Sequence, residues 1–309
     1  MSIVLICNNK DPKPWADGLS LAFPDTAVEI FPDVKNKAEV TFAVCWKPKT
    51  DDLEQFPALE VVQSLGAGVE HILQTTTITP PLRLCRIVDP GLANDMWEFA
   101  LAVVMNQLKK LRQYQQQQHE RIWEQYGYGT IASTRIGVLG LGKIGALVAQ
   151  QFAQLGFPVS GWSASAKDIP GVKSFQGEAE LSRCLAQSDI LINILPLTDR
   201  TTGILNKDTL QQLPQGAYVI NVGRGGHLVD EDLLSLLDNA HLDGALLDVF
   251  HQEPLPNDHP FWTHPKVSIT PHIASLTNKD TAMGQIIENY RRLQSGEPLL
   301  HEVMIQKGY

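Results

Sequence analysis

A glycine-rich segment in the middle of the chain has the residue types and the spacing of a dinucleotide-binding loop. It reads Gly140-Leu141-Gly142-Lys143-Ile144-Gly145, follows the apolar run 136–139 and opens a helix-compatible stretch. In a G-x-G-x-x-G loop the first glycine permits a tight turn, the second lets the backbone approach a pyrophosphate, and the third lets the helix pack on the strand. This context predicts a dinucleotide site rather than a glycine-rich turn without a ligand.

The residues expected at the end of the next strand bear on the choice between NAD and NADP. They read Trp162-Ser163-Ala164-Ser165-Ala166-Lys167 and include no acid. An Asp or Glu at this place would accept a hydrogen bond from the ribose 2′-hydroxyl of NAD and would repel a 2′-phosphate. Its absence, together with Ser163, Ser165 and Lys167, favours NADP, with NAD as the alternative if Lys167 is only a solvated loop lysine.

Arg224 lies between glycines in the segment Ile220-Asn221-Val222-Gly223-Arg224-Gly225-Gly226, which follows a strand-like run. Ligands of open parallel sheets bind at the carboxyl ends of the strands. A guanidinium can bind a carboxylate through two parallel hydrogen bonds. The position therefore favours a substrate that carries a carboxylate, against the alternative of a surface arginine in a turn.

Two later segments, 244–254 and 264–274, also follow strand-like runs, and each contains a histidine near its end. A carboxylate beside a histidine stabilises the imidazolium form and fixes the tautomer, so such a pair is a common acid–base unit. A lone histidine is more often structural. We assign no role to five histidines of the second half, namely His227, His241, His251, His259 and His264.

Alternating strand-like and helical segments surround these motifs. After residue 133, strands are expected at 136–140, 157–162, 190–195, 217–222 and 244–249, with a helix at 143–155. This rhythm predicts an α/β fold with a doubly wound parallel sheet of the Rossmann type. In the first hundred residues, apolar runs at 3–7, 40–46, 59–65 and 82–88 read as buried parallel strands of a smaller α/β layer.

Two helical segments connect these parts. Residues 94–125 contain neither Gly nor Pro and have apolar residues at helical spacing, which predicts one long helix. Its polar second half would be an exposed arm or subunit contact, or simply a solvated helix face. The segment 278–294 predicts an amphipathic helix closed by Gly296, which is expected to return to the first domain.

Composition excludes several classes of protein. At 309 residues, two domains are expected, and 43% hydrophobic with 19% charged residues is ordinary for a globular chain. A net charge of −9 disfavours nucleic acid as the main partner. The four cysteines lie far apart and are expected to be buried reduced thiols, with no metal site. No apolar stretch is long enough to span a membrane and the N-terminus lacks a basic leader, so a cytoplasmic location is expected.

Four motifs occur in the order and spacing of a known family: GLGKIG, INVGRGG, ALLDVFHQEP and TPHIAS. Over essentially its whole length, the chain resembles the D-isomer-specific 2-hydroxyacid dehydrogenase family. Within it, the segments 64–69, 162–165 and 195–198 are most similar to the reductases of glyoxylate and hydroxypyruvate. One departure is Ala164, because that subfamily usually carries an arginine there, which implies a weaker preference for NADP.

The resemblance implies roles for individual residues. The catalytic residues are Arg224, Glu253 and His272. Further cofactor contacts are expected from Leu195, Pro196, Val222, Gly223 and Asp248, in addition to the glycine loop and to Trp162, Ser163, Ser165 and Lys167. The substrate contacts are expected to be Arg224, Trp46 and the turn Leu65, Gly66, Ala67 and Gly68, although a buried strand-end tryptophan explains Trp46 equally well.

The resemblance also implies an activity and an organisation. The expected reaction is NAD(P)H-dependent reduction of a small 2-oxo acid, glyoxylate to glycolate or hydroxypyruvate to D-glycerate. Residues 1–96 and 277–309 would form a flavodoxin-like substrate domain, residues 97–276 the cofactor domain, and the cleft between them the active site of a homodimer. Two alternatives are a reductase of bulkier acids such as pyruvate or phenylpyruvate, and a non-catalytic corepressor-like protein that senses NAD(H) and binds peptides.

Overall fold

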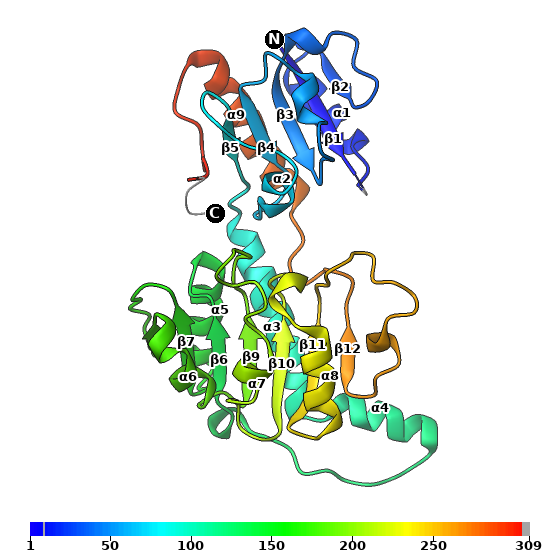
Figure 1. Cartoon of the computed structure of the whole chain (residues 1–309), viewed down its shortest axis with the longest axis vertical. Coiled ribbons are helices and arrows are strands. Elements are labelled where there is room, and N and C mark those ends of the chain that lie inside the picture. Colours follow the sequence, from blue (N-terminus) through cyan, green and yellow to red (C-terminus); the bar gives the residue numbers. More distant parts are fainter. Residues whose placement is uncertain (9, 305–309) are drawn as a thin grey trace. The chain divides into compact units, whose positions relative to one another are not determined.

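Two units make up the chain, and each is built around its own parallel sheet (Figure 1). The computed structural model describes residues 1–8 and 10–304. The first unit comprises residues 1–91 together with the C-terminal segment that begins at Thr277, and the second unit comprises residues 92–276.

The first unit contains a five-stranded sheet in the order β2-β1-β3-β4-β5. Every neighbouring pair is parallel, and the order is that of flavodoxin-like sheets. Helices α1 and α9 pack together beside it, and Tyr290 of α9 contacts Phe23 and Phe42 edge-on, with ring centroids 4.8 and 5.5 Å apart. The elements of this unit are β1 Ser2–Cys7, α1 Lys13–Ala22, β2 Val28–Ile30, β3 Val40–Trp46, β4 Val61–Ser64, α2 Glu70–Leu73, β5 Arg83–Cys85 and α9 Lys279–Ser295.

The second unit contains a seven-stranded sheet in the order β12-β11-β10-β9-β6-β7-β8. All of its pairs are parallel. The strand order therefore reverses between β6 and β9, and such a switch point is where doubly wound sheets bind dinucleotides. The strands are β6 Ile136–Leu139, β7 Val159–Ser163, β8 Val172–Gln176, β9 Ile190–Asn193, β10 Ala217–Asn221, β11 Leu242–Leu247 and β12 Val267–Ile269.

Helices cover both faces of this larger sheet. Alternate residues of β10 point to opposite faces, so Tyr218 and Ile220 pack with α3 and α5, whereas Val219 packs with α6, α7 and α8. The helices are α3 Pro90–Leu108, α4 Leu111–Glu120, α5 Lys143–Gln154, α6 Glu178–Leu185, α7 Lys207–Leu210 and α8 Asp230–Asp238. Short 3₁₀ helices lie at Lys37–Glu39, Leu53–Gln55, Ile131–Ser133, Gly225–His227 and Pro260–Trp262. The fold thus confirms the expected pair of α/β layers.

The expectation of one helix over 94–125 is wrong. Helix α3 ends at Leu108, and Lys110 adopts a left-handed conformation with φ of 56° before α4 begins at Leu111. The new direction is anchored by ionic and polar contacts, because the Lys110 ammonium lies 2.9 Å from Asp243 and the Arg112 guanidinium donates to the Val267 carbonyl at 2.8 Å. The start of α4 is therefore held against the beginnings of β11 and β12.

The sequence predicts that the four cysteines are buried reduced thiols. All four cysteines are free, three of them are buried, and Cys7 is half-buried. Burial raises the pKa of Cys184 to about 12, so its thiol stays protonated near neutral pH.

Within residues 1–8 and 10–304, no helix is long and apolar enough to cross a membrane, and no cluster of three or more His, Cys, Asp or Glu is placed to hold a metal ion.

Candidate active site

The glycine loop occupies the turn between β6 and α5, at the switch point of the larger sheet. Gly145 packs so closely that a Cβ added there would lie 1.8 Å from the carbonyl oxygen of Gly140. Around Gly142, by contrast, an added Cβ would meet no atom within 4 Å, and this residue is the N-cap of α5. The loop therefore presents an open backbone surface at a helix N-terminus, which suits a pyrophosphate.

The segment after β7 is divided between the core and the surface. The Trp162 side chain is only 8% exposed and its indole N–H donates to the Gly177 carbonyl at 2.8 Å. Ser163 is also buried, and its hydroxyl donates to the carbonyl of Ser165 at 2.7 Å. Ala164, Ser165 and Lys167 are exposed. Of the residues predicted to contact a cofactor here, Ser165 and Lys167 are thus the ones whose side chains face solvent.

The carboxyl end of β9 adds a second wall beside the glycine loop, because β9 pairs with β6. Leu195 is buried, and its amide donates to the side-chain oxygen of Asn193 at 3.3 Å. The carbonyl of Pro196 accepts from the hydroxyl of Thr201 at 2.7 Å. Both predicted residues are therefore held in a fixed turn directly after the strand.

Arg224 follows the carboxyl end of the neighbouring strand β10. Its Nη1 donates to the carbonyl of Gly223 at 2.7 Å, and the side chain is partly exposed. A Cβ added at the next residue, Gly225, would lie 1.9 Å from the carbonyl carbon of Phe250. The turn that carries Arg224 is thus packed directly against the backbone that leads to Glu253.

Glu253 and His272 form a hydrogen-bonded pair, as the resemblance implies for an acid–base unit. The Oε2 atom of Glu253 lies 2.9 Å from Nδ1 of His272, and the two side chains are 21% and 35% exposed. The other carboxylate oxygen, Oε1, accepts from the amide of Phe250 at 3.2 Å. Because Nδ1 faces the carboxylate, Nε2 of His272 is the atom that can exchange a proton with a substrate.

Asp248, directly after β11, positions the turn that carries His272. Its carboxylate is 1% exposed and accepts from the Thr270 hydroxyl and from the amides of Ile273 and Ala274 at 2.6, 2.8 and 2.9 Å. Its backbone carbonyl accepts from the amide of His272 at 2.9 Å, which helps to hold that residue at a left-handed φ of 55°. The expected contact of Asp248 with a nicotinamide stays a prediction.

In the first unit, Trp46 lies against the turn that follows β4. A Cβ added at Gly66 would be 2.8 Å from the indole ring of Trp46. The ring also meets His71 edge-on at 4.8 Å and lies under the Lys10 ammonium at 3.5 Å. Trp46 is partly exposed. The structure thus brings together Trp46 and the predicted substrate turn.

The four backbone amides of the turn 65–68 differ in whether they donate to a protein acceptor. The Leu65 amide donates to the carbonyl of Cys45 at 3.0 Å, and the Gly66 amide donates to the Ser64 hydroxyl at 3.1 Å. Within the part of the chain that the structure describes, the amides of Ala67 and Gly68 donate to no protein acceptor. Only these two amides of the turn are therefore available for a carboxylate.

Three residues that sequence reasoning left out lie beneath the second unit's site. Asn193, Asn221 and His227 are all 0% exposed and are hydrogen-bonded to one another or to the turns above them. The available signal was two asparagines at the ends of otherwise apolar strands. His251 and His259 also gain a partner, since their Nε2 atoms lie 3.6 and 3.4 Å from Asp230, whose pKa is raised by burial.

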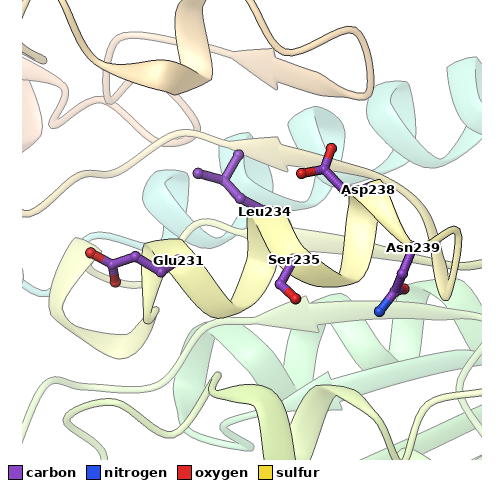
Figure 2. A pocket seen from close by; sticks show the side chains of 5 residues that line it. All are labelled: Glu231, Leu234, Ser235, Asp238 and Asn239. Carbon is purple, nitrogen blue, oxygen red and sulfur yellow. The ribbon is translucent and has the colours of Figure 1, made fainter.

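A surface pocket along α8 contains none of the predicted site residues. Figure 2 shows its side chains along one helix and its C-terminal end. They are Glu231, Leu234, Ser235, Asp238 and Asn239. Because this set offers neither a histidine nor a cation, it does not suit the anionic ligands that the glycine loop and Arg224 favour.

Comparison with known proteins places the chain among related enzymes. The family model for the D-isomer-specific 2-hydroxyacid dehydrogenase NAD-binding domain matches residues 101–274. A protein named glyoxylate/hydroxypyruvate reductase A from Photorhabdus laumondii is 40% identical over 304 residues, which cover 97% of each chain. A protein of the same name from Salmonella newport is 38% identical over 300 residues, 96% of each chain.

The chain is also similar to solved structures of proteins named as members of this family or as reductases of these acids. A D-isomer-specific 2-hydroxyacid dehydrogenase from Xanthobacter autotrophicus, in complex with NADPH and MES, is 36% identical with a TM-score of 0.92, covering 100% of this chain and 99% of that one. An NADPH-dependent glyoxylate/hydroxypyruvate reductase from Sinorhizobium meliloti, in complex with NADP and sulfate, is 33% identical with a TM-score of 0.92, covering 100% of both chains.

Proposed function

The chain belongs to the D-isomer-specific 2-hydroxyacid dehydrogenase family, and from that premise we propose that it is an NADPH-dependent reductase of glyoxylate and hydroxypyruvate. The observation that carries the proposal is the Glu253–His272 pair at 2.9 Å, on a backbone that packs against the turn of Arg224. The relatives named for this activity and the NADP complexes among the structural neighbours support the substrate and the cofactor.

The residues at the switch point fit a nicotinamide dinucleotide. The open surface at Gly142 and the helix N-terminus behind it suit the pyrophosphate, while the turn at Leu195 and Pro196 and the residues Val222 and Gly223 border the same sheet edge. When bound, the reduced cofactor supplies the hydride that is added to the substrate carbonyl carbon.

The chain's own residues supply charge and a proton. Arg224 binds the substrate carboxylate and stabilises the negative charge that develops on the carbonyl oxygen. His272 donates the proton to that oxygen from Nε2, while Glu253 at Nδ1 stabilises the imidazolium and fixes its orientation. In the first unit, the available amides of Ala67 and Gly68 suit a carboxylate oxygen, and Trp46 shapes the side of that turn.

A substrate panel tests this function. The purified chain is given NADPH or NADH with glyoxylate, hydroxypyruvate, pyruvate and phenylpyruvate, and loss of reduced nicotinamide absorbance is followed. We expect the highest kcat/KM for glyoxylate or hydroxypyruvate with NADPH. Turnover of only the bulkier acids would refute the substrate assignment. Tight cofactor binding without turnover of any acid would favour the sensor alternative, for which cofactor-dependent capture of peptides is the matching assay.

Ala164→Arg should raise affinity for NADPH without changing affinity for NADH. Ala164 is exposed beside Ser165 and Lys167, where a guanidinium could bind the 2′-phosphate that only NADPH carries. A charge-assisted hydrogen bond of this kind corresponds to a decrease of about tenfold in the Kd for NADPH. Titration of cofactor fluorescence with both dinucleotides measures it, and NADH is the internal control. An equal change for both cofactors would show that the 2′-phosphate does not bind at this segment.

We also propose a cytoplasmic homodimer. After α4, Trp123 is 99% exposed, and Ile122 and Tyr128 are 46% and 66% exposed, which is a large apolar surface for a monomer. The four free cysteines and an NADPH-dependent activity suit a reducing compartment. Light scattering should give twice the chain mass of 34.2 kDa, and a monomeric mass would refute the assembly. Cell fractionation tests the location.

A further inference from the structure

A buried polar network lies directly beneath Arg224 and beneath the turn after β9. It consists of the side chains of Asn193 at the end of β9, Asn221 at the end of β10, and His227 in the 3₁₀ helix that follows Arg224. All three residues are 0% exposed. Burying three polar side chains costs free energy unless each is hydrogen-bonded, so the network calls for an explanation beyond packing.

The surroundings of His227 select one tautomer. Its Nδ1 lies 3.0 Å from the backbone nitrogen of Arg224, which can only donate, so Nδ1 accepts and carries no proton. Its Nε2 lies 3.2 Å from the carbonyl oxygen of Pro196, which can only accept, so Nε2 carries the proton. The neutral Nε2–H imidazole satisfies both contacts. In imidazolium, by contrast, the Nδ1–H of His227 would face the backbone N–H of Arg224.

The two asparagines complete the set of hydrogen bonds. Asn193 donates to the side-chain oxygen of Asn221 at 2.9 Å and directs the same amide nitrogen to Nδ1 of His227 at 3.0 Å. Asn221 in turn donates to the carbonyl oxygen of Arg224 at 3.1 Å. The backbone nitrogen and the carbonyl oxygen of Arg224 are therefore both held by buried side chains.

The packing around the network explains why a glycine precedes Arg224. A Cβ added at Gly223 would lie 2.9 Å from Nδ2 of Asn193 and 2.9 Å from Nδ1 of His227. The network and the turn therefore fit without spare room. A displacement of His227 would move the main chain of Arg224 on one side and the Pro196 turn on the other.

We propose that His227 is a positioning residue that couples the substrate-binding arginine to the cofactor turn. Its Nδ1 fixes the main chain of Arg224, and its Nε2–H fixes Pro196, so one buried ring sets the relative placement of two parts of the site. The effect on catalysis rests on the proposed function, because Arg224 and Pro196 act on substrate and cofactor only if that function holds.

Two substitutions separate the two nitrogens. His227→Asn keeps an acceptor near the position of Nδ1 and lacks the Nε2–H donor, whereas His227→Gln keeps a donor near Nε2 and lacks the acceptor at Nδ1. We expect His227→Asn to weaken NADPH binding by about tenfold with kcat nearly unchanged, because the Pro196 carbonyl loses the His227 donor and retains the Thr201 hydroxyl. We expect His227→Gln to lower kcat by a similar factor with NADPH affinity nearly unchanged.

Steady-state kinetics with glyoxylate and hydroxypyruvate and a fluorescence titration of NADPH measure this division. His241→Gln, at a histidine outside the network, is the matched control and should behave like the unchanged protein. If both His227 variants lower only the unfolding temperature and leave kcat, KM and Kd intact, His227 is a structural core histidine and the proposal is overturned. The same conclusion follows if the two variants show one shared pattern.

A measurement on the unchanged protein keeps the tautomer testable even if a variant fails to fold. The ¹⁵N chemical shifts of the His227 ring distinguish a protonated Nε2 from a protonated Nδ1. We expect the Nε2–H form with and without NADPH, and the Nδ1–H form or imidazolium would overturn the network as described. Because this readout needs no turnover, it separates failure of the network from failure of the reductase assignment, which the substrate panel tests.

Discussion

Replacing His272 by alanine should lower kcat for reduction of glyoxylate or hydroxypyruvate by about 10²- to 10⁴-fold, the usual contribution of a general acid. The imidazole is held at Nδ1 by Glu253 at 2.9 Å, and its turn is fixed by the buried carboxylate of Asp248. Because those backbone bonds do not involve the ring, the turn should survive its removal. Affinity for NADPH should therefore change little.

Stopped-flow or steady-state kinetics together with an NADPH titration check this expectation. His264→Ala is a matched control, because His264 lies in the same unit and pairs with Asp238 at 3.3 Å, away from the glycine loop and Arg224. It should leave kcat unchanged. If His272→Ala instead abolishes NADPH binding while the protein remains folded, His272 holds the cofactor site and is not the proton donor.

Glu253→Gln tests how the carboxylate beside His272 contributes to the same proton transfer. The amide keeps the size of the side chain but removes the charge that stabilises the imidazolium. The proton donor in the reduction is the charged ring, so we expect Glu253→Gln to lower kcat by about 10- to 100-fold, the size of a lost charge-assisted hydrogen bond. Steady-state kinetics measure this change, and an NADPH titration should show an unchanged Kd. An unchanged kcat would show that the 2.9 Å contact does not influence the proton donor.

The central strands could be predicted from sequence, whereas the edge strands β2 and β8 could not. Strands β6, β9 and β10 lie inside the sheet and are buried along their whole length, so they appear as continuous apolar runs. By contrast, β8 has a single buried residue and β2 has three half-buried residues, and neither produces such a run. The break at Lys110 was also hidden, because no glycine or proline accompanies its left-handed conformation.

The residues of the candidate site also differ in whether a local sequence pattern could identify them. Arg224, Glu253 and His272 could be named as candidates because each lies in a short motif just after a strand, where parallel sheets place their ligands. His227 could not, because its role depends on Asn193, which is 34 residues earlier and meets it only through the pairing of β9 with β10. The linear pattern shows an asparagine at the end of each of two apolar strands, but it does not show that His227 meets them.

Arg224→Lys should lower kcat/KM for 2-oxo acids by about 10²- to 10³-fold, although it keeps the positive charge. The main chain of Arg224 is held by His227 and Asn221, so the side chain starts from a fixed point. A guanidinium can bind a carboxylate and a developing oxyanion with parallel hydrogen bonds, whereas an ammonium on a flexible stem offers no planar fork. The loss should therefore be in transition-state stabilisation as well as in substrate binding.

Kinetics over a full range of substrate concentration, with NADPH saturating, separate the two contributions. Arg183→Lys is the matched control, because Arg183 is an exposed residue of α6 that pairs with Glu180 at 2.7 Å. The activity of the Arg183→Lys variant should equal that of the unchanged protein. Adding guanidinium to Arg224→Ala should restore part of the lost kcat, because the missing group is then supplied from solution. Near-normal turnover of Arg224→Lys would mean that charge alone suffices and that the bidentate role assigned to Arg224 is wrong.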